Sequence, residues 1–108
     1  DQADAILDGV QSGFVYQRES HPNASQFAKV CRTLHKAKHA TITSSGMAAL
    51  SLAVLSQLEQ GDHVVVCNRL YGRSIALLSS ELQRLAIQHS LVDSCDLQAV
   101  EDAMTDNT

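Results

Sequence analysis

The run of residues from 63 to 67 reads His-Val-Val-Val-Cys and follows a Gly-Asp pair at 61 and 62. β-branched residues favour extended structure, and the run shows no alternation of apolar and polar positions. Continuous apolar strands of this kind are typical of parallel sheets, in which helices cover both faces. The run therefore predicts an α/β protein whose sheet is mostly parallel.

Helix and strand patterns alternate along most of the remaining chain. The predicted helices span residues 27–37, 47–58, 75–85 and 97–104, and the predicted strands span 40–43, 63–67 and 86–92. This order favours an α/β layered domain over residues 23–108. Residues 1–22 do not follow the pattern, and we expect them to form an arm with one short helix. The helix over 47–58 is apolar nearly all round, which predicts burial on most sides.

Three strands are few for the sheet of an α/β layer. Such a sheet would leave long apolar edges exposed, and the chain reaches residues 106–108 where a further strand would be expected to begin. We therefore expect the 108 residues to be an incomplete part of a larger domain.

Composition excludes several classes of function. The net charge of -4 leaves no basic footprint for nucleic acid. Three widely spaced cysteines, Cys31, Cys67 and Cys95, predict neither a disulfide framework nor a metal site, and they favour a reducing cytoplasm. The longest apolar stretch, around residues 47–55, is too short to cross a bilayer.

Residues 41–49 form the segment most suggestive of function, because a β-branched run breaks at Ser-Ser-Gly and enters an apolar helix. The first turn of a helix carries N–H groups without partners and a partial positive charge, which together attract anions such as phosphate. Ser45 is also an ordinary helix cap and Gly46 an ordinary turn residue. The segment alone leaves both interpretations open.

Five motifs in the same register resemble the pyridoxal-phosphate (PLP) enzymes of cysteine and methionine metabolism, the trans-sulfuration family. This family includes cystathionine synthases and lyases, methionine γ-lyases and acylhomoserine sulfhydrylases. The motifs are Tyr16-Gln17-Arg18, His21-Pro22-Asn23, Ser45-Gly46-Met47-Ala48-Ala49, Gly61-Asp62 and Tyr71-Gly72. Asp93 and Asp96 lie where the family often carries aspartates. The agreement extends from about Gly9 to Asp102.

The resemblance implies a fold and an activity. The fold is part of the large domain of a fold-type-I enzyme, similar to aspartate aminotransferase. The activity is β- or γ-elimination or replacement on cysteine, cystathionine, methionine or an activated homoserine. Two alternatives remain: an enzyme of the same fold with another amino-acid substrate, and a free-standing phosphate-binding or dimerisation module without catalysis.

The resemblance also assigns cofactor-binding residues. Ser45, with the backbone N–H groups of Gly46 and Met47, would hold the phosphate of pyridoxal 5'-phosphate. Tyr16 and Arg18 would reach the same phosphate from a neighbouring subunit, which implies a homodimer or homotetramer. Considered without the resemblance, Arg18 is a solvated charge.

Tyr71 would stack on the pyridine ring and exchange a proton with the small-molecule substrate, which makes it the expected catalytic residue of this chain. A lone tyrosine at a helix entry is otherwise a half-buried packing residue.

The sequence departs from the family pattern at two positions and lacks two groups. His21-Pro22-Asn23 stands where the family has Asn-Pro-Thr, and Ala76 stands where cystathionine-cleaving members often carry arginine. In the family, the lysine that binds the cofactor covalently and the aspartate beside the pyridine nitrogen lie downstream of the segment that this chain resembles. Lys29, Lys36 and Lys38 do not match that lysine, so we expect the 108 residues alone to be inactive.

Overall fold

The computed structural model describes residues 2–17 and 20–108. The chain forms two compact units, residues 1–44 and residues 45–108, which are treated separately below. Among the described residues, no helix has both the length and the apolar composition that crossing a membrane requires.

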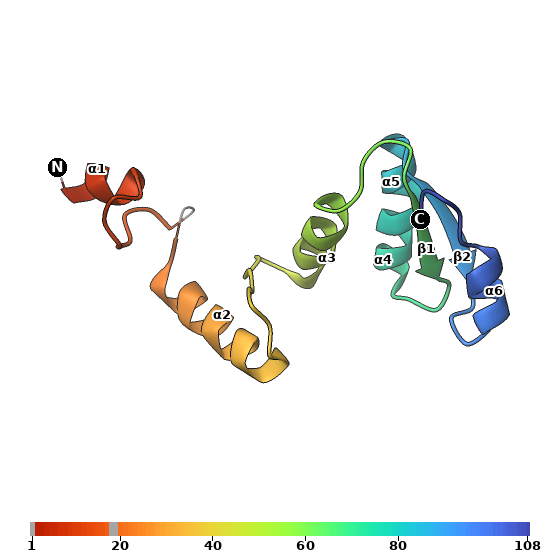
Figure 1. The fold of residues 1–108 in the computed structure, drawn as a ribbon, viewed down its shortest axis with the longest axis horizontal. Helices are drawn as coiled ribbons and strands as arrows, with labels where there is room; N and C mark the ends of the chain where they lie inside the picture. Colours follow the sequence, from red (N-terminus) through yellow and green to blue (C-terminus); the bar gives the residue numbers. More distant parts are fainter. Residues whose placement is uncertain (1, 18–19) are drawn as a thin grey trace. The chain divides into compact units, whose positions relative to one another are not determined.

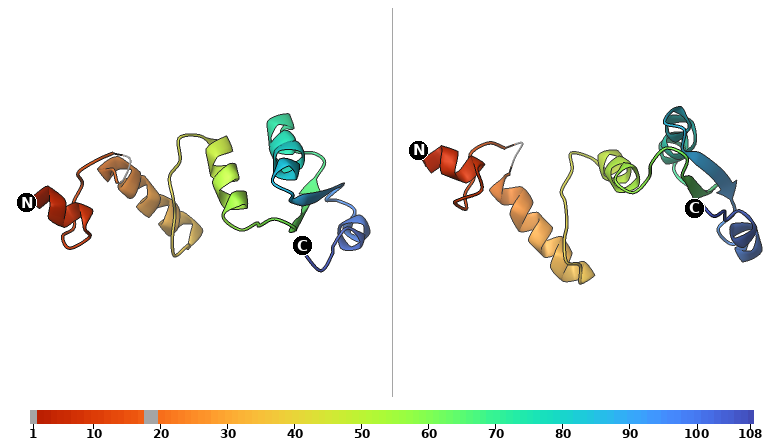
Figure 2. Two further views of the ribbon diagram at one scale, coloured as in Figure 1. Left: turned by 90° about the horizontal axis from the view of Figure 1, so that it is seen from above. Right: turned by 45° about the horizontal axis from the view of Figure 1, so that its top comes forward.

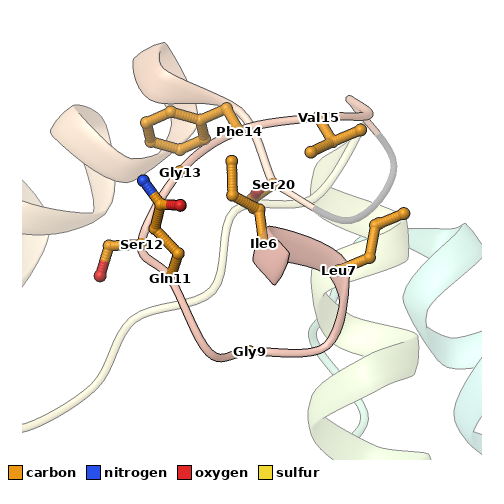
Figure 3. Close-up of a pocket in the computed structure, with 9 residues that line it drawn as sticks. All are labelled: Ile6, Leu7, Gly9, Gln11, Ser12, Gly13, Phe14, Val15 and Ser20. Carbon is orange, nitrogen blue, oxygen red and sulfur yellow. The ribbon is translucent and has the colours of Figure 1, made fainter. Parts of the chain in front are cut away.

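The first unit contains α1 (Gln2–Leu7) and α2 (Pro22–His35), joined by the rest of the arm. The arm folds back on α1, since the N–H groups of Val10 and Gln11 both donate to the carbonyl of Ala5. Gly13 passes so close to Ile6 that an added Cβ atom would overlap the Ile6 side chain. Figure 3 shows the resulting hollow, which arm residues line and which contains none of the predicted site residues.

The start of α2 explains one departure from the family pattern. His21 is extended, and its Nδ1 accepts a hydrogen bond from the N–H of Asn23 at 3.2 Å. Pro22 follows in the first turn, where a missing N–H has no cost. The imidazole of His21 thus caps the helix, as the shorter asparagine side chain can.

One expectation for the first unit is not met, and one of its helix faces is exposed. Residues 40–43 form no strand, because sheet bonds need a neighbouring strand and none of the described residues offers one there. The apolar face of α2 is present but uncovered, with Phe27 57%, Val30 51% and Leu34 74% exposed.

The second unit begins with α3 (Gly46–Leu55) and continues through β1 (His63–Cys67). Gly61 makes the turn before β1 with a φ of 94°, a conformation that favours glycine. The crossover from β1 consists of α4 (Gly72–Ala76), a π-helical turn (Leu77–Glu81) and α5 (Leu82–Arg84). It leads into β2 (Gln88–Val92), after which α6 (Leu97–Asp102) completes the unit (Figure 1).

The two strands pair in parallel, with His63 opposite Gln88 and Cys67 opposite Val92. The parallel sheet and its flanking helices confirm the predicted fold class. Among the described residues, two strands form the sheet, one fewer than predicted. Figure 2 shows the crossover helices and α6 on opposite sides of the strands.

A small apolar core joins the crossover to one face of the sheet. Val66, Leu78, Leu82 and Ile87 are buried, and Val54, Leu58 and Val64 pack against them. The prediction that the apolar α3 is buried on most sides is wrong for this chain. None of its residues is buried, and Leu52 and Leu55 remain 48% and 45% exposed.

Leucines 82 and 85 allow a direct test of this core. Leu82 is 1% exposed and Leu85 is 53% exposed. We expect Leu82→Ala to lower the free energy of unfolding by about 2–5 kcal/mol, since it leaves a cavity between Val66 and Ile87. Leu85→Ala should cost less than about 1 kcal/mol. Urea denaturation of both variants measures the difference, and equal costs would contradict the assigned core.

Candidate functional site: a helix N-terminus beside an exposed tyrosine

Ser45 organises the start of α3. Its backbone is extended, with φ -161° and ψ 163°, and its Oγ accepts a hydrogen bond from the N–H of Ala48 at 3.1 Å. The N–H of Ala49 bonds to the carbonyl of Ser45. The capping interpretation is therefore correct for this hydroxyl. Because the hydroxyl caps Ala48, the N–H groups of Gly46 and Met47 remain available at the helix end.

The space in front of Gly46 is open. A Cβ atom added to Gly46 would meet no atom of the chain within 4 Å. A ligand can therefore approach the backbone of the first turn closely, and the ten-residue α3 adds the favourable field of its N-terminus. This geometry fits a phosphate group and is compatible with the phosphate of pyridoxal phosphate.

Tyr71 lies directly before α4, at the end of the loop that leaves β1. Its carbonyl accepts hydrogen bonds from the N–H groups of Ser74 and Ile75 at 2.8 and 3.1 Å, which joins it to the first turn of α4. Its side chain makes no capping hydrogen bond and is 70% exposed. Tyr71 is therefore not a half-buried packing residue within this chain, and the faces of its ring remain available for stacking.

The first turns of α3 and α4 are in contact. Ser74 Oγ lies 3.9 Å from Met47 Sδ, within the distance of a weak hydrogen bond to sulfur. Because Met47 adjoins Gly46 and Ser74 is three residues from Tyr71, this contact brings the open helix end and the exposed tyrosine into one region. That region lies beyond the carboxyl end of β1, where open α/β sheets bind ligands.

The other two predicted site residues, Tyr16 and Arg18, do not belong to the second unit. Tyr16 belongs to the first unit, is 57% exposed and lines a shallow hollow with His21 and residues 42–44. Arg18 lies outside the described residues. The structure therefore brings together four of the six predicted site residues, namely Ser45, Gly46, Met47 and Tyr71.

A polar cluster that the sequence patterns did not indicate lies at the carboxyl ends of the two strands. Cys67 Sγ lies 3.2 Å from Ser94 Oγ, and Arg69 Nη2 forms an ion pair with Asp93 Oδ2 at 2.7 Å. The N–H of Arg69 also donates to Cys67 Sγ at 3.4 Å. The parallel register could have indicated the cluster, because it pairs Cys67 with Val92 and so places the residues that follow the two strands side by side.

The cluster alters the acidity of Cys67. The hydrogen bond from Ser94 lowers the pKa of the Cys67 thiol below its ordinary value, and the backbone N–H of Arg69 adds to this effect. Both donors stabilise the thiolate, whereas the negative charge of Asp93 opposes it. The thiolate fraction at neutral pH is therefore raised, and with it the reactivity of Cys67.

Alkylation by iodoacetamide tests this effect. Ser94→Ala removes the main stabilising hydrogen bond, so the pKa of Cys67 should rise and alkylation near pH 7 should slow. At about pH 10 the parent and the variant should react alike, because both thiols are then ionised. Peptide mass spectrometry follows Cys67, with the exposed Cys95 as an internal control. A rate ratio that stays constant with pH would contradict the proposed cause.

A second polar group, His63, is buried at the amino end of β1. Its Nε2 bonds to Ser90 Oγ and its Nδ1 to Thr108 Oγ1, both at 2.9 Å. Both ring nitrogens thus have partners, and His63 is a structural residue that lies at the other end of the strand from Tyr71. Within the described part of the chain, no three histidine, cysteine or acidic side chains gather in a way that could hold a metal ion.

Comparisons with known proteins agree with this geometry. The family model of the Cys/Met metabolism PLP-dependent enzymes matches residues 1–108. The L-methionine γ-lyase of Fusobacterium nucleatum subsp. polymorphum is 36% identical over 98 residues, which are 91% of this chain and 25% of that protein. The O-succinylhomoserine sulfhydrylase of Pseudomonas aeruginosa is 35% identical over 106 residues, 98% of this chain and 26% of that protein.

A solved structure shares the fold of this chain. The putative O-acetylhomoserine (thiol)-lyase of Campylobacter jejuni, which contains a pyridoxyl-lysine phosphate, matches with a TM-score of 0.85 and 29% identity. The match covers 100% of this chain and 27% of that chain.

The fold is that of part of a fold-type-I PLP enzyme. The chain belongs to the family of Cys/Met metabolism PLP-dependent enzymes. It spans about a quarter of the length of the curated relatives that it matches.

Proposed function

We propose that the whole protein is a PLP-dependent enzyme of sulfur amino-acid metabolism that catalyses β- or γ-elimination or replacement. Its substrate is cysteine, cystathionine, methionine or an activated homoserine, and the names of its relatives cover the last three. The observation that carries this proposal is the open N-terminus of α3 beside the exposed ring of Tyr71.

In this proposal the residues of the chain bind and orient the cofactor. The N–H groups of Gly46 and Met47 donate to the phosphate, with Ser45 holding the turn that presents them. The ring of Tyr71 stacks on the pyridine ring. When bound, the cofactor supplies an electron sink for the negative charge that develops on the substrate. The phenolic Oη of Tyr71 takes or returns a proton at the reacting amino acid.

The two tyrosines of the chain should separate turnover from cofactor binding. In the full-length enzyme, Tyr71→Phe keeps the stacking ring and removes the hydroxyl. Turnover should fall by about two to four orders of magnitude, while cofactor affinity changes much less. Tyr16→Phe is the matched variant and should mainly weaken cofactor binding. Equilibrium titration of the apoenzyme and steady-state kinetics measure the two effects, and unchanged turnover in Tyr71→Phe would remove that residue from the chemistry.

Tyr16 and Arg18 are proposed to serve the active site of a neighbouring subunit. Arginine suits this role because its planar guanidinium donates two hydrogen bonds to a phosphate and keeps its charge at any relevant pH. A site built from two chains requires an oligomer with two-fold interfaces, and we propose a homodimer or homotetramer. The three free cysteines suit a reducing compartment, and we propose the cytoplasm.

Subunit mixing tests the shared site. Full-length Arg18→Ala and a second variant without the cofactor-binding lysine should each be nearly inactive. When the two are refolded together, about half of the dimers are hybrids with one complete site, so activity should return to roughly a quarter of the parent value. Refolding each variant alone is the control. No recovery in the mixture would mean that Arg18 acts within its own chain.

A further inference from the structure

The loop that carries Tyr71 has few contacts of its own. Residues 68–71, here called the Tyr71 loop, are exposed, and the side chain of Tyr71 makes no capping hydrogen bond to α4. An exposed loop without cross-links samples many conformations, and ordering it has an entropic cost. A ring that must meet a cofactor in one orientation therefore needs support from outside the loop.

Three contacts join the end of β1 and the start of this loop to the end of β2 and the residues that follow it. The N–H of Asn68 donates to the carbonyl of Val92 at 2.8 Å and extends the strand pairing by one bond. Cys67 Sγ and Ser94 Oγ lie 3.2 Å apart. Arg69 Nη2 meets Asp93 Oδ2 at 2.7 Å, the contact that reaches furthest along the loop.

Asp93 is itself held in place. Its second oxygen, Oδ1, accepts a hydrogen bond from the N–H of Cys95 at 3.0 Å, so the carboxylate bridges its own turn and Arg69. The backbone of Arg69 is held as well, because its N–H donates to Cys67 Sγ. Arg69 is separated from Tyr71 by a single residue, so a shift of its backbone moves the tyrosine.

We propose that Arg69 and Asp93 are positioning residues that fix the Tyr71 loop and thereby set the orientation of the Tyr71 ring over the cofactor. This inference rests on the proposed function in one respect, namely the role given to Tyr71. Their side chains are 73% and 32% exposed, and an exposed ion pair contributes little to overall stability. Its effect lies in orientation, because a misplacement of about 1 Å can lower a rate by up to a hundredfold.

Hydrogen–deuterium exchange on the apoenzyme tests the structural part. In Arg69→Ala the amides of the Tyr71 loop should exchange about two- to fivefold faster, the range that an exposed pair can account for. Asp93→Asn should act similarly, since it removes the charge and keeps an oxygen for the N–H of Cys95. Unchanged exchange in both single variants would overturn the proposal.

Arg84 offers a matched control. It pairs with Glu81 at 3.2 Å, and both side chains are more exposed than their counterparts in the Arg69–Asp93 pair. This pair lies within the crossover helix and joins no loops, so Arg84→Ala should leave exchange in the Tyr71 loop and turnover unchanged. Faster loop exchange in Arg84→Ala as well would show a general loss of charge pairing and would overturn the specific role of Arg69.

Kinetic coupling tests the positioning role. In the full-length holoenzyme, Arg69→Ala should lower kcat about tenfold. In a Tyr71→Phe background the same change should have almost no further effect on kcat, because the proton-transferring hydroxyl is already absent. Independent, multiplicative effects would overturn the proposal and indicate that Arg69 acts on the substrate directly.

The two failures can be told apart. If Tyr71→Phe leaves turnover unchanged, the role of Tyr71 fails and the positioning role fails with it. If Tyr71→Phe is nearly inactive but loop exchange does not respond to Arg69→Ala, the ion pair alone is excluded.

Discussion

The parallel pairing of β1 with β2 is the constraint on which the second unit depends. Parallel strands cannot be joined by a tight turn, so the chain must cross from the carboxyl end of β1 to the amino end of β2. The crossover consists of α4, the π-helical turn and α5, which bury Leu78 and Leu82 against Val66. The same pairing places the loops after both strands at one edge of the sheet. Tyr71 and the Arg69–Asp93 pair lie there because of the register.

The second element of the site, the start of α3, depends on small residues rather than on the sheet. Ser45 is extended and caps Ala48, while Gly46 presents no side chain, so the first N–H groups face open space. The contact between Ser74 and Met47 connects this turn to α4. The start of α3 and the helix that Tyr71 precedes are thus joined through Met47 and Ser74.

Sequence patterns predicted the second unit better than the first. The β-branched run at 63–67 matches β1 residue for residue, because it lies in a sheet that its own crossover completes. The strand expected at 86–92 begins at residue 88, since Ala86 adopts a left-handed φ of 58° that ends the crossover helix. The strand expected at 40–43 depends on pairing partners, which sequence periodicity does not encode, and it does not form.

The same distinction applies to burial and to the site. The apolar composition of α3 indicates a helix that other elements should cover. Composition does not specify which chain segment covers it, and here Leu52 and Leu55 stay exposed. Ser45, Gly46 and Tyr71 could be predicted because local chemistry and the family pattern coincide there. The Arg69–Asp93 pair could not, because its residues are 24 positions apart and meet only through the strand register.

The two faces of β1 carry different kinds of side chain, although its sequence reads as a continuous apolar run. Val64 and Val66 contact the core, whereas His63 and Cys67 lie on the opposite face, as alternation along a strand requires. Each of these two residues meets a serine that follows the same alternation on β2 and just beyond it, Ser90 for His63 and Ser94 for Cys67.

A buried imidazole such as that of His63 needs partners for both nitrogens, and Ser90 and Thr108 provide them. At the other end of the strand, the hydroxyl of Ser94 bonds to a thiol beside the proposed active site. The polar face therefore stabilises the amino end of the strand and tunes the chemistry of the carboxyl end with the same device, a serine hydroxyl supplied by the neighbouring strand or by the loop that follows it.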